Sequence, residues 1–220
     1  MHLIPSKIPE FLQPLFPDYC VLTKPVEGKK EIFLTFDDGP VPVVTEFVLA
    51  QLKAYNAKAT FFCVGDNIKK NPDVFKKILS AEHTVGNHTM NHLKAWSCKH
   101  IAYIQNVNAC AQVIEQYPFT AKAQTLFRPP YGQISPSKLK KLHEMGYKII
   151  LWDVLSKDYN SKVSPEQCVS NVVQNVQNGS IVVFHDSLKA FTNLQYALPR
   201  VLDLLSKQGY SFRSLTHTNS

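Results

Sequence analysis

The 220-residue sequence contains few cysteines, and none of them lies in a C-x-x-C pair. Its five cysteines are odd in number and widely spaced along the chain. This pattern argues against a disulfide framework, a cysteine-based zinc site and a dithiol redox centre. We therefore expect the fold to depend on an ordinary hydrophobic core.

Long apolar runs are also missing, above all from the N-terminus, which reads MHLIPSKIPEFLQPLFPDY. Four prolines interrupt this stretch, which is typical neither of a signal peptide nor of a membrane anchor. We expect no integral membrane segment and a cytoplasmic location, or an exported one if the natural protein carries a leader ahead of this sequence.

The chain has no long basic block, although its formal net charge is +7. Such a charge favours encounters with anionic partners in general. The lysines, however, are scattered in short pairs and no nucleic-acid-binding motif is present, so we expect no nucleic-acid partner. Nothing in the sequence indicates an oligomeric state.

Internal repeats and low-complexity linkers are absent as well, and 45% hydrophobic with 19% charged residues is a normal globular composition. The length suits one domain. We expect an extended, proline-punctuated arm over residues 1–30 and one folded domain over residues 31–220. The arm's apolar side chains, expected to pack on the body, are Ile8, Phe11, Leu12, Leu15 and Phe16.

What the sequence does contain is an alternation of short β-branched runs with amphipathic stretches. We predict strands within residues 32–36, 59–64, 84–87, 125–128, 148–152 and 180–185. Helices are predicted after Pro42 through Leu52, over 101–117 and 135–145, and from Leu194 to Leu205. This order predicts an α/β fold, in which functional groups gather at the carboxyl ends of the strands.

The first polar motif, TFDDGP over residues 35–40, follows an apolar strand. Neighbouring side chains that leave a strand point in different directions. Asp37 and Asp38 can therefore have different tasks, one at a metal and one at a substrate. An ordinary Asp-Asp-Gly turn is an equally good interpretation of this motif alone.

The second motif, NHTMNH over residues 87–92, separates His88 and His92 by four positions. On a helix this spacing would place both imidazoles on one face. With the carboxylate of Asp38 they would form a three-ligand metal site with coordination positions left open, as catalytic sites require. A nitrogen and oxygen donor set does not select the metal. We take one divalent ion, zinc by default, and cobalt, nickel, iron or manganese would also fit.

The third motif is RPPYG over residues 128–132, in which two prolines restrict the backbone and Arg128 could pair with a carboxylate. With these motifs, ATFFCVG at 59–65, a W…DY segment and SIVVFHDS at 180–187, residues 31–215 resemble the polysaccharide deacetylases of carbohydrate esterase family 4, the NodB-homology proteins. The resemblance implies a distorted (β/α) barrel of about seven strands.

The resemblance also implies a role for each matching residue. Asp37 would be the general base, braced by Arg128, and Asp38, His88 and His92 would be the metal ligands. His185 would be the general acid, oriented by Asp158, and the backbone amide of Tyr131 would help to hold the oxyanion. No organic cofactor is implied.

One segment departs from the pattern of many family members, W-x-x-D-x-x-D-W. Here Leu155 replaces the first aspartate and Tyr159 the final tryptophan, whereas Asp158 is kept. The change affects the wall of the predicted pocket and therefore the identity of the substrate more than the chemistry.

The function implied is a metal-dependent hydrolase that removes N-acetyl groups from amino sugars of a glycan, either peptidoglycan or a chitin-like oligosaccharide. Alternatives with the same chemistry are a sugar O-acetyl ester, a lipid-linked amino sugar or a cyclic amide as substrate. A catalytically dead glycan-binding module is a further alternative, which the presence of every matching polar residue disfavours.

Overall fold

A computed structural model describes residues 6–7, 16–23, 28–117 and 126–215. These residues form nine strands and seven α-helices. The strands are β1 (Cys20–Val21), β2 (Glu31–Asp37), β3 (Thr60–Cys63), β4 (Thr84–Asn87), β5 (Leu126–Phe127), β6 (Lys148–Ile150), β7 (Val154–Leu155), β8 (Ile181–His185) and β9 (Ser211–Arg213). The helices are α1 (Val44–Ala54), α2 (Gly65–Lys70), α3 (Pro72–Ser80), α4 (His100–Ile114), α5 (Pro136–Glu144), α6 (Pro165–Val173) and α7 (Phe191–Lys207).

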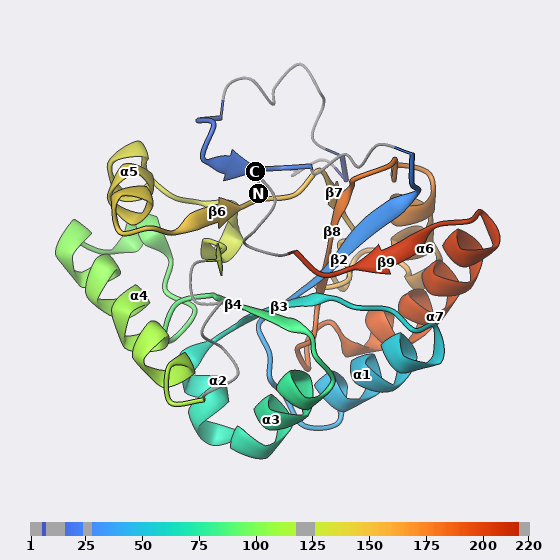
Figure 1. Ribbon diagram of the computed structural model, residues 1–220, viewed down its shortest axis with the longest axis horizontal. Helices are drawn as coiled ribbons and strands as arrows, with labels where there is room; N and C mark the ends of the chain where they lie inside the picture. Colours follow the sequence, from blue (N-terminus) through green and yellow to red (C-terminus); the bar gives the residue numbers. More distant parts are fainter. Residues whose placement is uncertain (1–5, 8–15, 24–27, 118–125, 216–220) are drawn as a thin grey trace.

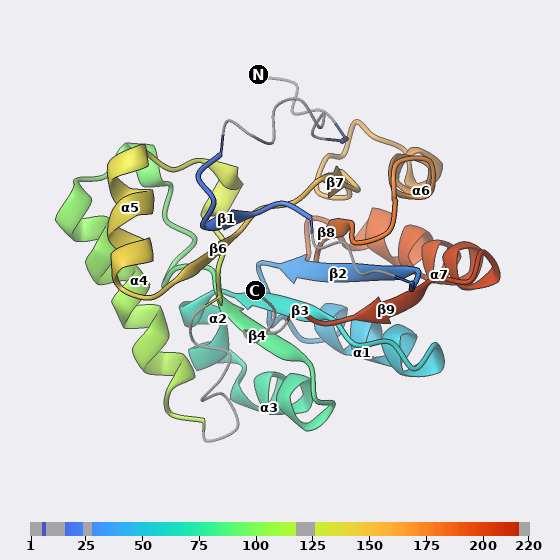
Figure 2. The same cartoon turned by 45° about the horizontal axis from the view of Figure 1, so that its top comes forward.

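The strands form one curled parallel sheet in the order β1-β6-β5-β4-β3-β2-β8-β7, and β9 pairs with the start of β2. The helices surround the outside of this curl, from α5 at one end to α6 at the other (Figures 1 and 2). No pairing joins β1 to β7 in the described part of the chain, so the barrel is open between them. The expected distorted (β/α) barrel is confirmed, with two strands more than the seven or so predicted.

Alternation along β2 explains how one strand serves both a core and a site. Successive side chains of a strand point to opposite faces. Ile32, Leu34 and Phe36 belong to the large cluster between the sheet and the outer helices, whereas Phe33 belongs to the cluster inside the barrel. Thr35 and Asp37 share the inner face with Phe33, so this alternation aims Asp37 into the barrel.

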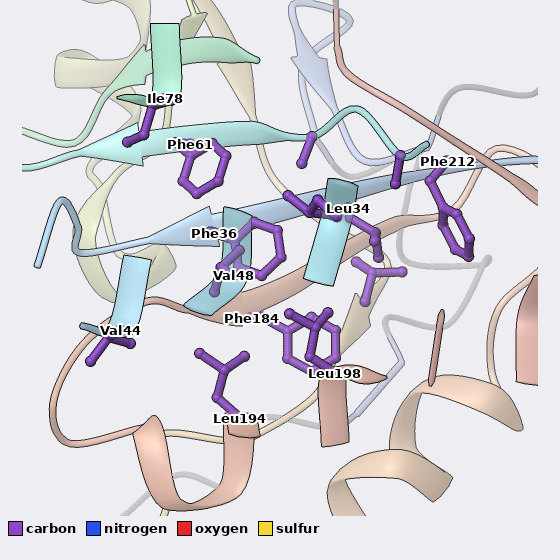
Figure 3. Packing of buried hydrophobic residues seen from close by; sticks show 14 of the residues in the cluster. Leu34, Phe36, Val44, Val48, Phe61, Ile78, Phe184, Leu194, Leu198 and Phe212 are labelled. Atoms are coloured by element: carbon purple, nitrogen blue, oxygen red, sulfur yellow. The ribbon is translucent and has the colours of Figure 1, made fainter. Parts of the chain in front are cut away.

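The outer core joins the sheet to helices from both ends of the chain. Figure 3 shows the rings of Phe36, Phe61 and Phe184 beside side chains of α1 and α7. The ring centroids of Phe36 and Phe61 lie 5.1 Å apart, and those of Phe36 and Phe184 lie 6.1 Å apart. These contacts hold β2 between β3 and β8, the two strands that flank it at its carboxyl end.

The helices predicted from periodicity are confirmed as α1, α4, α5 and α7, and the six predicted strands as β2 to β6 and β8. Elements without a prediction are β1, β7, β9, α2, α3 and α6. The three strands are two or three residues long, too short to show an alternation, and α2 has six residues. Helices α3 and α6 have nine residues each and begin with a proline, as α5 does, so the sequence carried a signal for them that was missed.

The predicted N-terminal arm is described only in part, and Ile8, Phe11, Leu12 and Leu15 lie outside the described residues. Within it, β1 pairs with β6, and Phe16 packs against the cluster that contains Leu142 and Ile149. Among the described helices, none combines the length and the apolar character that crossing a bilayer would require.

Candidate active site

The predicted site residues come together at the carboxyl ends of the strands, around a groove of about 580 Å³. Six of them line it: Asp37, Asp38, His88, His92, Tyr131 and His185. The other two, Arg128 and Asp158, are buried and bind Asp37 and His185 respectively. The structure therefore unites all eight residues, although they come from five separate segments of the chain.

Asp38, His88 and His92 form a cluster whose potential ligand atoms all lie within 4.8 Å of one another. Asp38 Oδ1 lies 3.2 Å from His92 Nε2 and 3.8 Å from His88 Nε2. This oxygen is buried, and no described group meets it in hydrogen-bond geometry. A buried carboxylate oxygen without a partner, facing two imidazole nitrogens, is what an ion bound between them would satisfy.

The protonation states suit metal binding. Burial lowers the pKa of His88 to about 4, which keeps this imidazole neutral. Its Nδ1 lies 2.8 Å from the carbonyl oxygen of Arg128, so the neutral ring donates there and leaves the lone pair of Nε2 for a metal. Burial by itself would raise the pKa of Asp38, but the nearby imidazole of His92, 3.2 Å away, and the charge of His185 hold it well below its ordinary value.

The expectation that His88 and His92 share a helix face is wrong. The segment after β4 is an irregular loop in which Thr89 and His92 adopt positive φ values of 68° and 56°. The loop is held by Asn87 and Thr89, whose side chains accept hydrogen bonds from backbone N–H groups within it. It brings the two imidazole centroids to 5.1 Å, so the predicted pairing holds for a different geometric reason.

Asp37 forms a buried ion pair with Arg128, and their Oδ1 and Nη1 atoms lie 2.7 Å apart. The guanidinium is fully buried and also donates to Thr35 Oγ1 and to the carbonyl oxygens of Ile150 and Leu151. Because every nitrogen of Arg128 is engaged, its position is fixed and it orients the carboxylate of Asp37. The other carboxylate oxygen of Asp37 is not used by this pair.

His185 and Asp158 form the second buried pair, with Nδ1 and Oδ1 2.8 Å apart. Asp158 also accepts hydrogen bonds from the backbone N–H of His185 and from Ser156 Oγ. Burial tends to lower the pKa of His185, but Asp158, with Asp38 and Asp37, outweighs it and raises the pKa to about 9. The imidazole is therefore cationic at neutral pH and can give up a proton from Nε2.

Asp158→Asn should lower the pKa of His185 in the metal-free protein by about 1–3 pKa units, because burial lowers this pKa and the main charge that raises it is then removed. The pKa of His185 is about 9 in the folded protein and 6.5 in the unfolded one. The ion pair therefore contributes its full stabilisation of the fold below pH 6.5, and this contribution is lost as pH rises through 9. The variant should therefore lose more stability at pH 6 than at pH 10. NMR titration of His185 and urea unfolding at both pH values measure this, and Asp203→Asn, at a half-exposed carboxylate that pairs with Lys207, is the control. An unchanged titration would contradict the pairing.

Asp186 supports the site and was missed by the sequence analysis. It is fully buried, and its carboxylate accepts hydrogen bonds from the N–H of Gly39 at 3.0 Å and from Thr45 Oγ1 at 2.6 Å. A Cβ at Gly39 would lie 2.0 Å from Asp186 Oδ2, so only glycine fits this contact. The contact positions the turn that carries Asp38, whose φ is 84°. In the sequence, the signal for Asp186 was its position directly after His185.

Tyr131, Leu155 and Tyr159 form walls of the groove. Tyr131 is 52% exposed and packs edge-on against His92, and Tyr159 does the same against His185. Leu155 is buried, so an apolar side chain occupies the place where the resemblance expects an aspartate. Backbone strain at Tyr131, with φ 62°, turns the chain at the mouth of the groove.

Comparison with known proteins agrees with this geometry. The family described as Polysaccharide deacetylase matches residues 24–150. A peptidoglycan-N-acetylglucosamine deacetylase of Bacillus cereus is 38% identical over 187 residues, which are 84% of this chain and 86% of that protein. The peptidoglycan-N-acetylmuramic acid deacetylase PdaC of Bacillus subtilis is 31% identical over 201 residues, 88% of this chain and 41% of that longer protein.

Two solved structures share the fold closely. The Bc1960 peptidoglycan N-acetylglucosamine deacetylase, in complex with 4-naphthalen-1-yl-N-oxidanyl-benzamide, has a TM-score of 0.84 at 29% identity, covering 94% of this chain and 95% of its own. PdaC from Bacillus subtilis has a TM-score of 0.76 at 29% identity, covering 86% and 89%. Motifs, barrel and paired side chains thus lead to one conclusion: the chain belongs to the polysaccharide deacetylases, the NodB-homology enzymes of carbohydrate esterase family 4.

Proposed function

We propose that this chain is a metal-dependent deacetylase that removes N-acetyl groups from amino sugars of a glycan, either peptidoglycan or a chitin-like oligosaccharide. One observation carries the proposal. The carboxylate of Asp37, the cationic imidazole of His185 and the Asp-His-His cluster line a single groove. Asp37 and His185 are Cα partners on the adjacent strands β2 and β8, so a base and an acid stand side by side.

The ion would be held by Asp38 Oδ1 and the Nε2 atoms of His88 and His92. When bound, such an ion lowers the pKa of water and polarises a carbonyl group. The donor set accepts zinc, cobalt, nickel, iron or manganese, and zinc is the default.

Two side chains of the protein, Asp37 and His185, would each carry out one proton transfer. Asp37, oriented by Arg128, takes a proton from the attacking water. The N–H of Tyr131, at the groove mouth, would help to stabilise the charge that develops on the acetyl oxygen. His185 then donates its Nε2 proton to the amine nitrogen as the C–N bond breaks, because an unprotonated amine leaves poorly. Acetate and a free amino sugar are the products.

Acetate release from N-acetylglucosamine oligomers tests this function. The zinc-reconstituted chain should release acetate, and the chelator-treated chain should not, until zinc or cobalt is restored. Metal content, measured separately by mass spectrometry, separates an empty site from an inactive one. No release from protein with one bound ion would reject this substrate class, and O-acetylated sugars, lipid-linked amino sugars and cyclic amides would be tried next.

A further inference from the structure

Two lysines, Lys157 and Lys189, line the groove beside the predicted acid. The Nζ of Lys189 lies 5.9 Å from the centre of the Tyr159 ring, and that ring packs against His185 with centroids 4.9 Å apart. Lys157 precedes Asp158, the carboxylate that binds His185. The Lys189 ammonium group therefore lies on the His185 side of the groove, and Lys157 lines the same groove one residue before the partner of His185.

Neither lysine has an acidic partner in the described part of the chain. The acidic side chains near the site are already engaged. Asp37 binds Arg128, Asp158 binds His185, and Asp38 faces the two histidines of the metal cluster. The two lysines therefore bring positive charge to the groove that no carboxylate of the described residues pairs with.

The backbone at Lys157 adds a second, independent observation. Its φ of 64° is left-handed, a conformation that is unfavourable for a side chain with a Cβ. The carbonyl of Lys157 accepts a hydrogen bond from the N–H of Asn160, and Ser156 N–H donates to Val183, so the turn is fixed on both sides. Strained positions of this kind gather at functional sites, and three other residues that line this groove share a positive φ: Asp38, His92 and Tyr131.

We propose that Lys157 and Lys189 bind an oxyanion of the substrate, a carboxylate or a phosphate ester on the glycan. The inference rests on the proposed function and names its substrate class. Because His185 must reach the nitrogen of the scissile bond, the amino sugar lies on the His185 side of the groove. An oxyanion on this sugar or its neighbour then lies next to the two ammonium groups.

The test measures binding without turnover, in the full, zinc-loaded chain with Asp37→Asn. Three oligosaccharides of equal length are compared: neutral N-acetylglucosamine, one with a carboxylate on alternate sugars, and one with a phosphate ester. Lys157→Gln combined with Lys189→Gln should raise the Kd for an anionic oligosaccharide about tenfold and that for the neutral one less than about twofold. The control is Lys162→Gln, an exposed lysine of the same loop that does not line the groove.

A loss of affinity in the double lysine variant for the carboxylate oligosaccharide, the phosphate oligosaccharide or both supports the proposal, and the ligand affected identifies the source of the oxyanion. An equal loss for the neutral oligosaccharide, or the same loss from Lys162→Gln, overturns it. Acetate release by the wild-type chain is measured in parallel. If no acetate appears but the anionic preference depends on the two lysines, the proposed function fails and the lysine assignment stands.

Discussion

Asp37→Asn is expected to lower kcat for acetate release by about 10²–10⁴-fold while the ion stays bound. Asparagine has the same shape and keeps an oxygen that can accept the 2.7 Å hydrogen bond from Arg128. It cannot take a proton from water at neutral pH. Asp37 does not belong to the Asp-His-His cluster, so the metal ligands are unchanged. The measurements are kcat and bound zinc per chain.

The matched control is Asp38→Asn, the same substitution one residue later. Because Asp38 supplies the one carboxylate oxygen of the cluster, this variant should lose zinc affinity as well as activity. The two variants would thus distinguish the role of Asp37 as the base from that of Asp38 as a metal ligand. Zinc loss from Asp37→Asn, or full activity of that variant at normal zinc content, would contradict the assignment.

Arg128→Met is expected to destabilise the metal-free protein by about 3–5 kcal/mol, because it leaves Asp37 as a buried charge without its partner. Arg128 is fully buried, and methionine fills much of its volume beside Phe62, whose ring centre lies 4.2 Å from the guanidinium carbon. Lost packing is therefore a small part of the cost. Urea unfolding of the metal-free protein gives the free energy without a contribution from metal binding.

Two comparisons make this prediction specific. Lys76→Met breaks an exposed ion pair with Asp73, whose atoms lie 3.1 Å apart, and should cost no more than about 1 kcal/mol. Adding Asp37→Asn to Arg128→Met removes the unpartnered charge and should restore part of the lost stability. If the double variant is less stable than Arg128→Met alone, the penalty does not come from the Asp37 charge.

Much of the fold was predictable because its signals are local. The apolar run of β2 and the helical periodicity of α1, α4, α5 and α7 are each encoded within one short stretch. Elements such as β1 and β9 could not be predicted in this way. They are strands because β6 and β2 offer them hydrogen-bond partners far away in the sequence.

The candidate site also has a part that local motifs predicted and a part that depends on tertiary contacts. The sequence by itself determined which residues are predicted to carry the chemistry, since Asp37, Asp38, His88, His92 and His185 stand in recognisable motifs at predicted strand ends. The residues that support them could not be read from the sequence. Asp186 and Gly39 are 147 positions apart in the chain, and they meet only because β8 lies beside β2.

Only the tertiary structure decided how the two histidines come together beside Asp38, through a loop rather than a helix, and that Lys157 and Lys189 line the same groove. Periodicity reports the neighbours of a residue along the chain. Hydrogen bonds such as that of Arg128 to Asp37 depend on groups that parallel strand pairing brings together from distant segments.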